Sequence, residues 1–319
     1  MSRARGLIAT VAASGAATVA YAAANRRPPG GSKTWSRTNH RGEPVTLLEG
    51  PAVAVGAIAG ALIRGGPARS GAAVAVAVAG AGAAAFGAYD DLAGSGDRRG
   101  FRGHLGALRH GEVTTGAVKL GGIGLTGLVS AALAGGSPAD VVINAGLVAG
   151  GANLLNLFDL RPGRAIKVAV ASGALIGAAG VRGGSGTGVA APVAAALALL
   201  PEDLGERAML GDCGANALGA MLGGAAATLP RPARIALLAG IAGLTAASEK
   251  VSFTKVIERT PLLHRLDMLG RRPAAVGAST APGGGESGGA GASAGGESGG
   301  AGSDGGVGSA PPAATAAPQ

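Results

Sequence analysis

The stretch that decides the fold is residues 152–164, which read ANLLNLFDLRPGR. Asn153, Asn156 and Asp159 are spaced three apart, so on a helix they form one slanting polar stripe at the C-terminal end of an apolar segment. The helix dipole disfavours a carboxylate at that end, and polar groups at membrane depth are costly unless they find partners. The stripe therefore indicates either a functional site or buried amides that bridge neighbouring helices.

The composition is typical of a polytopic membrane protein. Of 319 residues, 47% are hydrophobic and only 14% are charged, and the mean hydropathy is +0.37. Aromatic residues make up 2% while glycine occurs 62 times, so the apolar segments consist of small residues that let helices approach closely. The single cysteine, Cys213, excludes an intramolecular disulfide.

Nine apolar segments are long enough, or nearly so, to cross a bilayer. The sequence therefore predicts an all-α fold, a bundle of nine transmembrane helices. The segments are 7–24, 47–64, 70–89, 116–135, 139–158, 165–181, 187–200, 212–229 and 233–252.

The basic residues predict the orientation of this bundle. With the N-terminus outside, 19 lysines and arginines fall in or beside the cytoplasmic loops and 7 on the opposite side. The net charge of +9 therefore reflects membrane topology, and we expect no nucleic-acid partner. The first segment is read as a retained helix, because cleavage as a signal peptide would leave Arg26, Arg27 and further basic residues outside. We expect a protein of the plasma membrane with a cytoplasmic C-terminus.

The chain divides into two parts by composition. Residues 1–274 carry all the apolar segments, whereas residues 275–319 are almost entirely Gly, Ala, Ser and Pro with a few acids. Such a sequence cannot bury a core. We expect a transmembrane domain followed by a disordered cytoplasmic tail.

Further polar groups lie at the ends of the apolar segments. Asp90 and Asp91 end the third segment, where adjacent carboxylates repel each other unless a cation lies nearby; a solvated loop start is the alternative. Asp212 begins the eighth segment between glycines, a pattern that fits either a helix N-cap or a site for phosphate and a cation. His264 follows the last segment among arginines and is either a surface group or part of a cationic, phosphate-binding face.

The predicted topology places all these groups, together with Lys119 in the fourth segment, at the cytoplasmic interface. A shared site of carboxylates, amides and cations is the economical explanation. Carboxylate oxygens with a phosphate suit Mg²⁺, and the lack of a Cys/His cluster in the sequence argues against zinc.

In order along the chain, these motifs resemble those of the polyprenyl-phosphate N-acetylhexosamine-1-phosphate transferases. The shared pattern is Asp-Asp, then Asn-x-x-Asn-x-x-Asp, then Gly-Asp-x-Gly-x-x-x-Leu-Gly, then Pro-Leu-x-His, over roughly residues 35–272. The resemblance implies a cytoplasmic cleft in which polyprenyl phosphate attacks a UDP-N-acetylhexosamine with Mg²⁺ and releases UMP, for the synthesis of a cell-envelope polymer.

The resemblance also implies roles for individual residues. Asp212, with Asp91, would bind Mg²⁺, and Asp90 would orient or deprotonate the lipid phosphate. Lys119 would hold phosphate, and His264 would belong to the histidine loop of the family. The nucleotide and diphosphate side of the substrate would be bound by Asn153, Asn156 and Asp159. Arg161 and Arg164 are not part of the family motif, and we expect them to bind substrate beside these residues.

Three departures from the family pattern leave the sugar and the pathway open. The second aspartate of Asp-Gly-x-Asp-Gly is missing after Asp159, where Arg161 and Arg164 appear instead. His264 stands alone rather than in a His-x-His group, and Gly214-Ala215 replaces Gly-Ser.

Two alternatives to the enzyme follow. One is a non-catalytic relative that binds polyprenyl phosphate or a nucleotide as a scaffold or regulator. The other is a transporter, which the location of the polar groups at one interface disfavours. The expected partners are the lipid bilayer, polyprenyl phosphate and the UDP-sugar, and a homodimer stays open.

Overall fold

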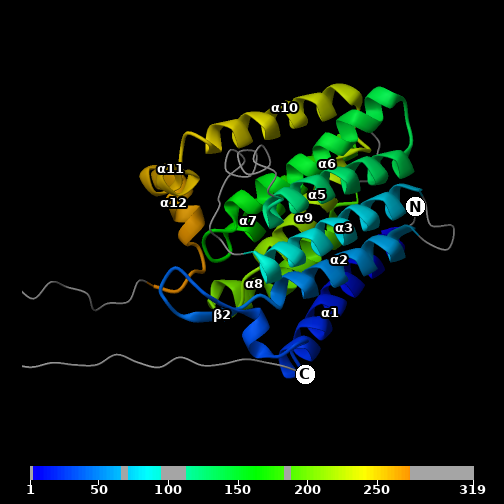
Figure 1. Cartoon of the computed structure of the whole chain (residues 1–319). Coiled ribbons are helices and arrows are strands. Elements are labelled where there is room, and N and C mark those ends of the chain that lie inside the picture. Colours follow the sequence, from blue (N-terminus) through cyan, green and yellow to red (C-terminus); the bar gives the residue numbers. More distant parts are fainter. Residues whose placement is uncertain (1–2, 66–70, 95–112, 183–187, 274–319) are drawn as a thin grey trace, which may run out of the picture. The chain divides into compact units, whose positions relative to one another are not determined.

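The computed structural model describes residues 3–65, 71–94, 113–182 and 188–273, and these residues are mostly helical (Figure 1). Each of the nine predicted apolar segments coincides with a helix, and two short helices follow them. The predicted tail, residues 275–319, lies outside the described residues. The helices are α1 (Arg3–Arg26), α2 (Glu49–Gly65), α3 (Gly71–Ala93), α5 (Thr115–Ala134), α6 (Pro138–Phe158), α7 (Arg164–Arg182), α8 (Ala190–Leu204), α9 (Gly211–Ala226), α10 (Arg231–Ser248), α11 (Phe253–Arg259) and α12 (Pro261–Met268).

Fewer helices than predicted meet the length and composition of a membrane span. Within the described ranges, α1, α3, α5, α6 and α7 are long and apolar enough to cross a bilayer. The pair α10 and α11, bent by 94° at its break, would make a sixth span. Helices α2, α8 and α9 have only 17, 15 and 16 residues. The helical bundle with several candidate spans is thus confirmed, whereas the nine-span topology and its orientation stay predictions.

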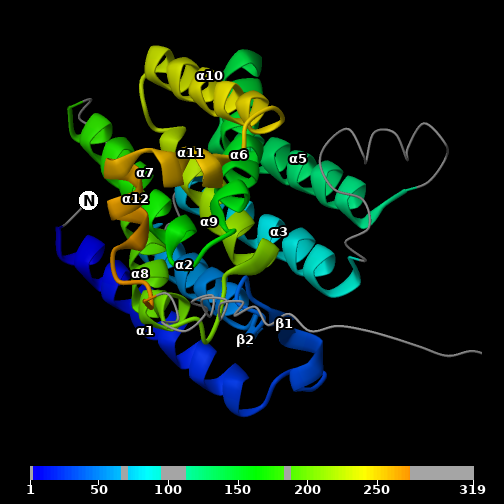
Figure 2. The same cartoon turned by 90° about the vertical axis from the view of Figure 1, so that its left-hand side faces the viewer.

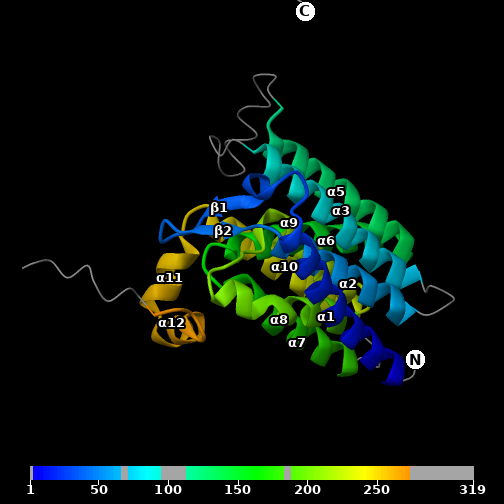
Figure 3. The ribbon, with the colours of Figure 1, turned by 90° about the horizontal axis from the view of Figure 1, so that it is seen from below.

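Helix α9 is the buried centre of the bundle. Of its 16 residues, 14 are buried, and it packs against α2, α3, α6 and α7. Figure 3 shows α3 and α5 on one side of α9 and α1 and α8 on the other. A Cβ atom at Gly219 would collide with the carbonyl oxygen of Gly151, and one at Gly223 with that of Leu147. These glycines therefore let α9 and α6 approach closely, as the small-residue composition predicts.

A two-stranded hairpin interrupts the helical fold, and the all-α prediction missed it. Strand β1 (Ser36–Thr38) follows a 3₁₀ turn (Ser32–Trp35) and pairs antiparallel with β2 (Pro44–Thr46). On its other edge Thr46 donates its N–H to the carbonyl of Arg207 at 3.2 Å and accepts one from Met209 at 3.0 Å. The hairpin is therefore fixed to the connection between α8 and α9. Strands of three residues are too short to show an alternating pattern in the sequence.

The hairpin, α11 and α12 gather at one end of the bundle, which Figure 2 shows face on. The rings of Phe158, at the end of α6, and Phe253, at the start of α11, stack with centroids 5.0 Å apart. Arg164, at the start of α7, forms an ion pair of 2.7 Å with Asp267 of α12. These two contacts hold the short C-terminal helices against the α6–α7 connection.

Candidate functional site

Asp90, Lys119 and Asp212 form one group, here named the lysine–carboxylate cluster. The Lys119 Nζ atom lies 2.6 Å from Asp90 Oδ2 and 2.5 Å from Asp212 Oδ2. The side chains of Lys119, Asp90 and Asp212 are only 15%, 16% and 23% exposed. Because a charge-assisted pair in a shielded place is stronger than one in water, the ammonium holds two carboxylates that would otherwise repel each other.

The backbone brings these three groups together from three helices. Asp90 lies in the last turn of α3, Lys119 in the second turn of α5, and Asp212 in the first turn of α9. Helix α3 packs against both α5 and α9. The approach is close, because a Cβ atom at Gly87 would collide with the carbonyl of Asp212. All three charged groups lie at helix ends.

Asp91 has a different role from its neighbour Asp90. Its Oδ1 accepts the N–H of Asp212 at 3.0 Å and its Oδ2 accepts the N–H of Cys213 at 2.9 Å. Asp91 therefore caps α9 from another helix, satisfying amides that have no partner within α9. Asp212 itself is not the N-cap, because its side chain pairs with Lys119. Arg37 of β1 donates to the carbonyl of Asp91 and ties the hairpin to the same place.

The asparagines and Asp159 of the polar stripe separate in the structure. Asn153 donates to Thr245 Oγ1 at 3.3 Å, so its amide bridges α6 to α10. The side chain of Asn156 makes no hydrogen bond within the described part of the chain. Asp159 ends α6, where burial and then the nearby carboxylates of Asp203 and Asp212 raise its pKa well above the usual value. Asp159 thus lies between the lysine–carboxylate cluster and a second group of acids.

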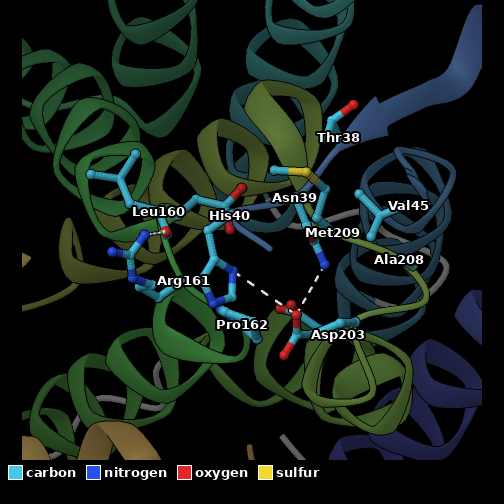
Figure 4. Close-up of a pocket in the computed structure, with 12 residues that line it drawn as sticks. Thr38, Asn39, His40, Val45, Leu160, Arg161, Pro162, Asp203, Ala208 and Met209 are labelled. Atoms are coloured by element: carbon cyan, nitrogen blue, oxygen red, sulfur yellow. Dashed lines mark hydrogen bonds and ion pairs between the residues drawn. The ribbon is translucent and has the colours of Figure 1, made fainter. Parts of the chain in front are cut away.

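That second group lines a cavity of about 200 Å³, here named the Asp203 cavity (Figure 4). Glu206 is satisfied, since it accepts from Asn39 Nδ2 and from Arg41 Nε, each at 2.9 Å. Asp203 is 3% exposed, and its Oδ2 has no hydrogen-bond partner among the described residues. Burial raises the pKa of Asp203 to about 7. The cavity is lined by Thr38, Asn39, His40, Val45, Asp159, Leu160, Arg161, Pro162, Asp203, Glu206, Ala208 and Met209.

His40 brings an imidazole into the same cavity. Its Nδ1 lies 3.9 Å from Glu206 Oε2, and its side chain is 26% exposed. Burial lowers the pKa of His40, and the cation of Arg161 lowers it further, against the opposing effect of Glu206. The imidazole is therefore mostly neutral at pH 7, so Glu206 depends on Arg41 and Asn39 for its partners.

The two arginines predicted to bind substrate differ in what they contact. Arg161 lines the Asp203 cavity and donates only to the carbonyl of its neighbour Leu160, at 3.2 Å. Arg164 is 3% exposed and donates to both carboxylate oxygens of Asp267, at 2.7 and 3.0 Å, and to Thr254. Burial alone would raise the pKa of Asp267, but the hydrogen bonds and charge of Arg164 outweigh it and lower that pKa. The guanidinium of Arg164 is thus committed to joining α7 to α12.

His264 lies apart from both groups. It is exposed on α12, and within the described residues its imidazole makes no hydrogen bond or ion pair. No contact joins it to the lysine–carboxylate cluster within the described residues, and its predicted role stays a prediction.

Four acidic or basic groups of this region were not singled out by the sequence: His40, Glu49, Asp203 and Glu206. Glu49 is fully buried at the start of α2, and neither carboxylate oxygen has a partner among the described residues. Its position was a usable signal, because it lies inside the predicted apolar segment 47–64, where a charged residue is costly unless it serves a purpose. The acids at 203 and 206 lay in what looked like an ordinary cytoplasmic loop.

Comparisons with known proteins do not assign the chain. No model of a known protein family matches it, and no curated protein sequence matches it.

The residues that the structure describes contain no group of three or more His, Cys, Asp or Glu side chains placed to hold a metal ion. Asp90 and Asp212 come close to such a site as a pair, because one carboxylate oxygen of each points at the Lys119 Nζ atom. Two convergent carboxylate oxygens are the chemistry that Mg²⁺ uses, with water and phosphate completing its coordination. The oxygens of the pair suit a magnesium ion, and in this structure the Lys119 ammonium holds both of them.

Proposed function

We propose that the protein is a membrane phosphotransferase that moves N-acetylhexosamine-1-phosphate from a UDP-sugar to polyprenyl phosphate, for the synthesis of a cell-envelope polymer. The observation that supports this most is the lysine–carboxylate cluster. Three charged residues from three distant segments meet at helix ends, and each side chain keeps a part of its surface exposed. A transporter would instead place such groups along a path through the bundle.

In the proposed reaction, an oxygen of polyprenyl phosphate attacks the sugar-linked phosphorus of the donor. A new P–O bond forms there, and the bond to the UMP oxygen breaks, so UMP leaves with the electron pair. Phosphoryl transfer of this kind depends on positioning and on neutralising charge rather than on covalent catalysis. The Lys119 ammonium would hold the phosphates, and Asp90 would orient the lipid phosphate or accept its proton.

Mg²⁺ would be held by Asp212 and Asp90 rather than by Asp91. Both oxygens of Asp91 accept hydrogen bonds from backbone amides of α9. Asp90 and Asp212, in contrast, each have one oxygen within 2.6 Å of the Lys119 Nζ atom. When bound, the ion would neutralise charge that develops on the diphosphate. Asp91 would then be a positioning residue, since it fixes the first turn of α9 and hence Asp212.

The non-catalytic binder is the second candidate, and one observation favours it. Lys119 already compensates Asp90 and Asp212 without any ligand. Such a cluster is stable without a metal ion and would also suit a protein that only binds a phosphate.

Release of UMP by the purified protein in detergent distinguishes the transferase from the non-catalytic binder. The assay contains undecaprenyl phosphate, Mg²⁺ and a panel of UDP-N-acetylhexosamines. We expect turnover that requires Mg²⁺ and falls by at least about 100-fold in Asp212→Asn, by analogy with the loss of other electrostatic groups at reacting centres. Asp140→Asn is the matched control, because Asp140 begins α6 and pairs with Arg231 at 2.6 Å, away from Asp159 at the end of that helix. Absence of turnover in folded protein that binds the lipid would favour the binder.

A further inference from the structure

The Asp203 cavity is outside the lysine–carboxylate cluster, yet Asp159 is close to both. Its volume is about 200 Å³. Pockets that enclose drug-sized molecules measure roughly 300 to 1,000 Å³. The cavity is therefore the size for one ring of a donor molecule and too small for a whole nucleotide sugar.

The walls of the cavity favour a sugar ring over a nucleobase. The lining includes the apolar side chains of Val45, Leu160 and Met209, which suit the C–H faces of a sugar. Its described residues contain no Phe, Tyr or Trp, so a base could stack there only on His40 or Arg161. The acids Asp159, Asp203 and Glu206 accept hydrogen bonds. A sugar has several hydroxyl donors for such acceptors, whereas a pyrimidine base has one N–H and two carbonyls.

The buried carboxylate of Asp203 is a second, independent indication that the cavity binds a ligand. Its Oδ2 has no partner among the described residues although the residue is only 3% exposed. Leaving a buried acceptor unpaired destabilises the folded protein. Asp203 lines the cavity, as Figure 4 shows, and a rotation of its carboxylate would bring this covered oxygen to a ligand hydroxyl there.

Arg161 offers a partner for negative charge in a cavity whose lining also carries three acids, Asp159, Asp203 and Glu206. Its guanidinium lines the cavity and, within the described ranges, has no carboxylate partner, unlike Arg41, which pairs with Glu206. Arg161 is labelled beside His40 in Figure 4. A neutral N-acetylhexosamine would leave this cation without a partner, but a carboxylate on the ring would pair with it.

We infer that the Asp203 cavity binds the sugar ring of the donor and that this sugar carries a carboxylate, which pairs with Arg161 while a ring hydroxyl donates to Asp203. The inference rests on the proposed function and names its substrate class, a UDP-linked hexosaminuronic acid.

Equilibrium binding tests the inference without requiring turnover. Full-length protein in detergent is titrated with UDP-N-acetylglucosaminuronic acid, with UDP-N-acetylglucosamine and with UMP. We expect the acidic donor to bind at least about tenfold more tightly than the neutral one, the effect of about 1.4 kcal/mol. Arg161→Gln should abolish that preference and leave UMP binding unchanged, and Asp203→Asn should weaken both sugar donors. Arg265→Gln, at an exposed arginine of α12, is the matched control and should change nothing.

The outcomes separate the inference from the function on which it rests. Equal binding of both donors, or a preference that survives Arg161→Gln, overturns the acidic sugar and leaves the transferase standing. Weaker binding of UMP to Arg161→Gln shows that the cavity holds the nucleotide and overturns the inference as well. If neither donor nor UMP binds to folded protein that still binds undecaprenyl phosphate, the proposed function fails together with the inference.

Discussion

Lys119 is the residue on which the cluster depends. Replacing it with methionine leaves Asp90 and Asp212 close together without a counter-charge, and breaking a buried ion pair in this way costs about 3 to 5 kcal/mol. We therefore expect Lys119→Met to lower the melting temperature in detergent and to abolish UMP release.

The double variant Lys119→Met/Asp90→Asn separates the two effects. It removes one of the two repelling charges, so stability should return in large part while activity stays lost. If the single variant melts like the wild type, the ion pairs of Lys119 contribute nothing to stability.

Asp203 should make stability depend on pH, because burial raises its pKa from 3.8 to about 7. Between these values the folded protein binds a proton that the unfolded chain has released, so wild-type stability falls as the pH rises. A pKa difference of one between the folded and unfolded states corresponds to about 1.4 kcal/mol. Asp203→Asn, which carries no charge, should match the wild type near pH 4 and be more stable by a few kcal/mol at pH 8. Thermal melts of both proteins across this range measure the difference, and parallel curves would contradict the prediction.

At the scale of elements, the contact between α9 and α6 depends on glycine. A methyl group at Gly219 meets the carbonyl of Gly151 and the backbone of Ala152, so Gly219→Ala should destabilise the protein by about 1 to 3 kcal/mol. Gly121 of α5 is the matched control, since nothing lies within 4 Å of an added Cβ there. Gly121→Ala should be neutral or stabilising by up to about 1 kcal/mol, because alanine favours the helix. Chemical or thermal unfolding in detergent compares the two, and equal effects would mean that the helices can separate without cost.

The sequence predicted the helices because a long run of small apolar residues between charged residues is expected to form a helix in a membrane. It counted α2, α8 and α9 as membrane spans although they are short, since buried helices and membrane spans have the same composition. The bend between α10 and α11 was missed for a similar reason, as the apolar run continues to residue 252 while the helix ends at Ser248.

For the whole bundle, the site could be predicted only where charges stand out against an apolar background. Asp90, Lys119 and Asp212 met this condition, and topology alone brought them to one face. Asp203 and Glu206 became part of a cavity through the hairpin, whose pairing with residues 207–209 is a long-range contact without a sequence signal. The role of His264 stays a prediction, because its imidazole is exposed on α12 and makes no hydrogen bond within the described residues that would tie it to either group.

The orientation of the whole molecule is the remaining prediction that decides the function, because the proposed site must face the cytoplasm. The excess of basic residues places Ala139 outside and Glu258 inside. Both positions are exposed, whereas the single native Cys213 is buried, so the wild type serves as the unlabelled control. A membrane-impermeant maleimide should label Ala139→Cys in intact cells and Glu258→Cys only after permeabilisation. Asp159 lies at the opposite end of α6 from Ala139. The reverse labelling pattern would therefore place Asp159 on the outer side of the membrane and would exclude a UDP-sugar supplied from the cytoplasm.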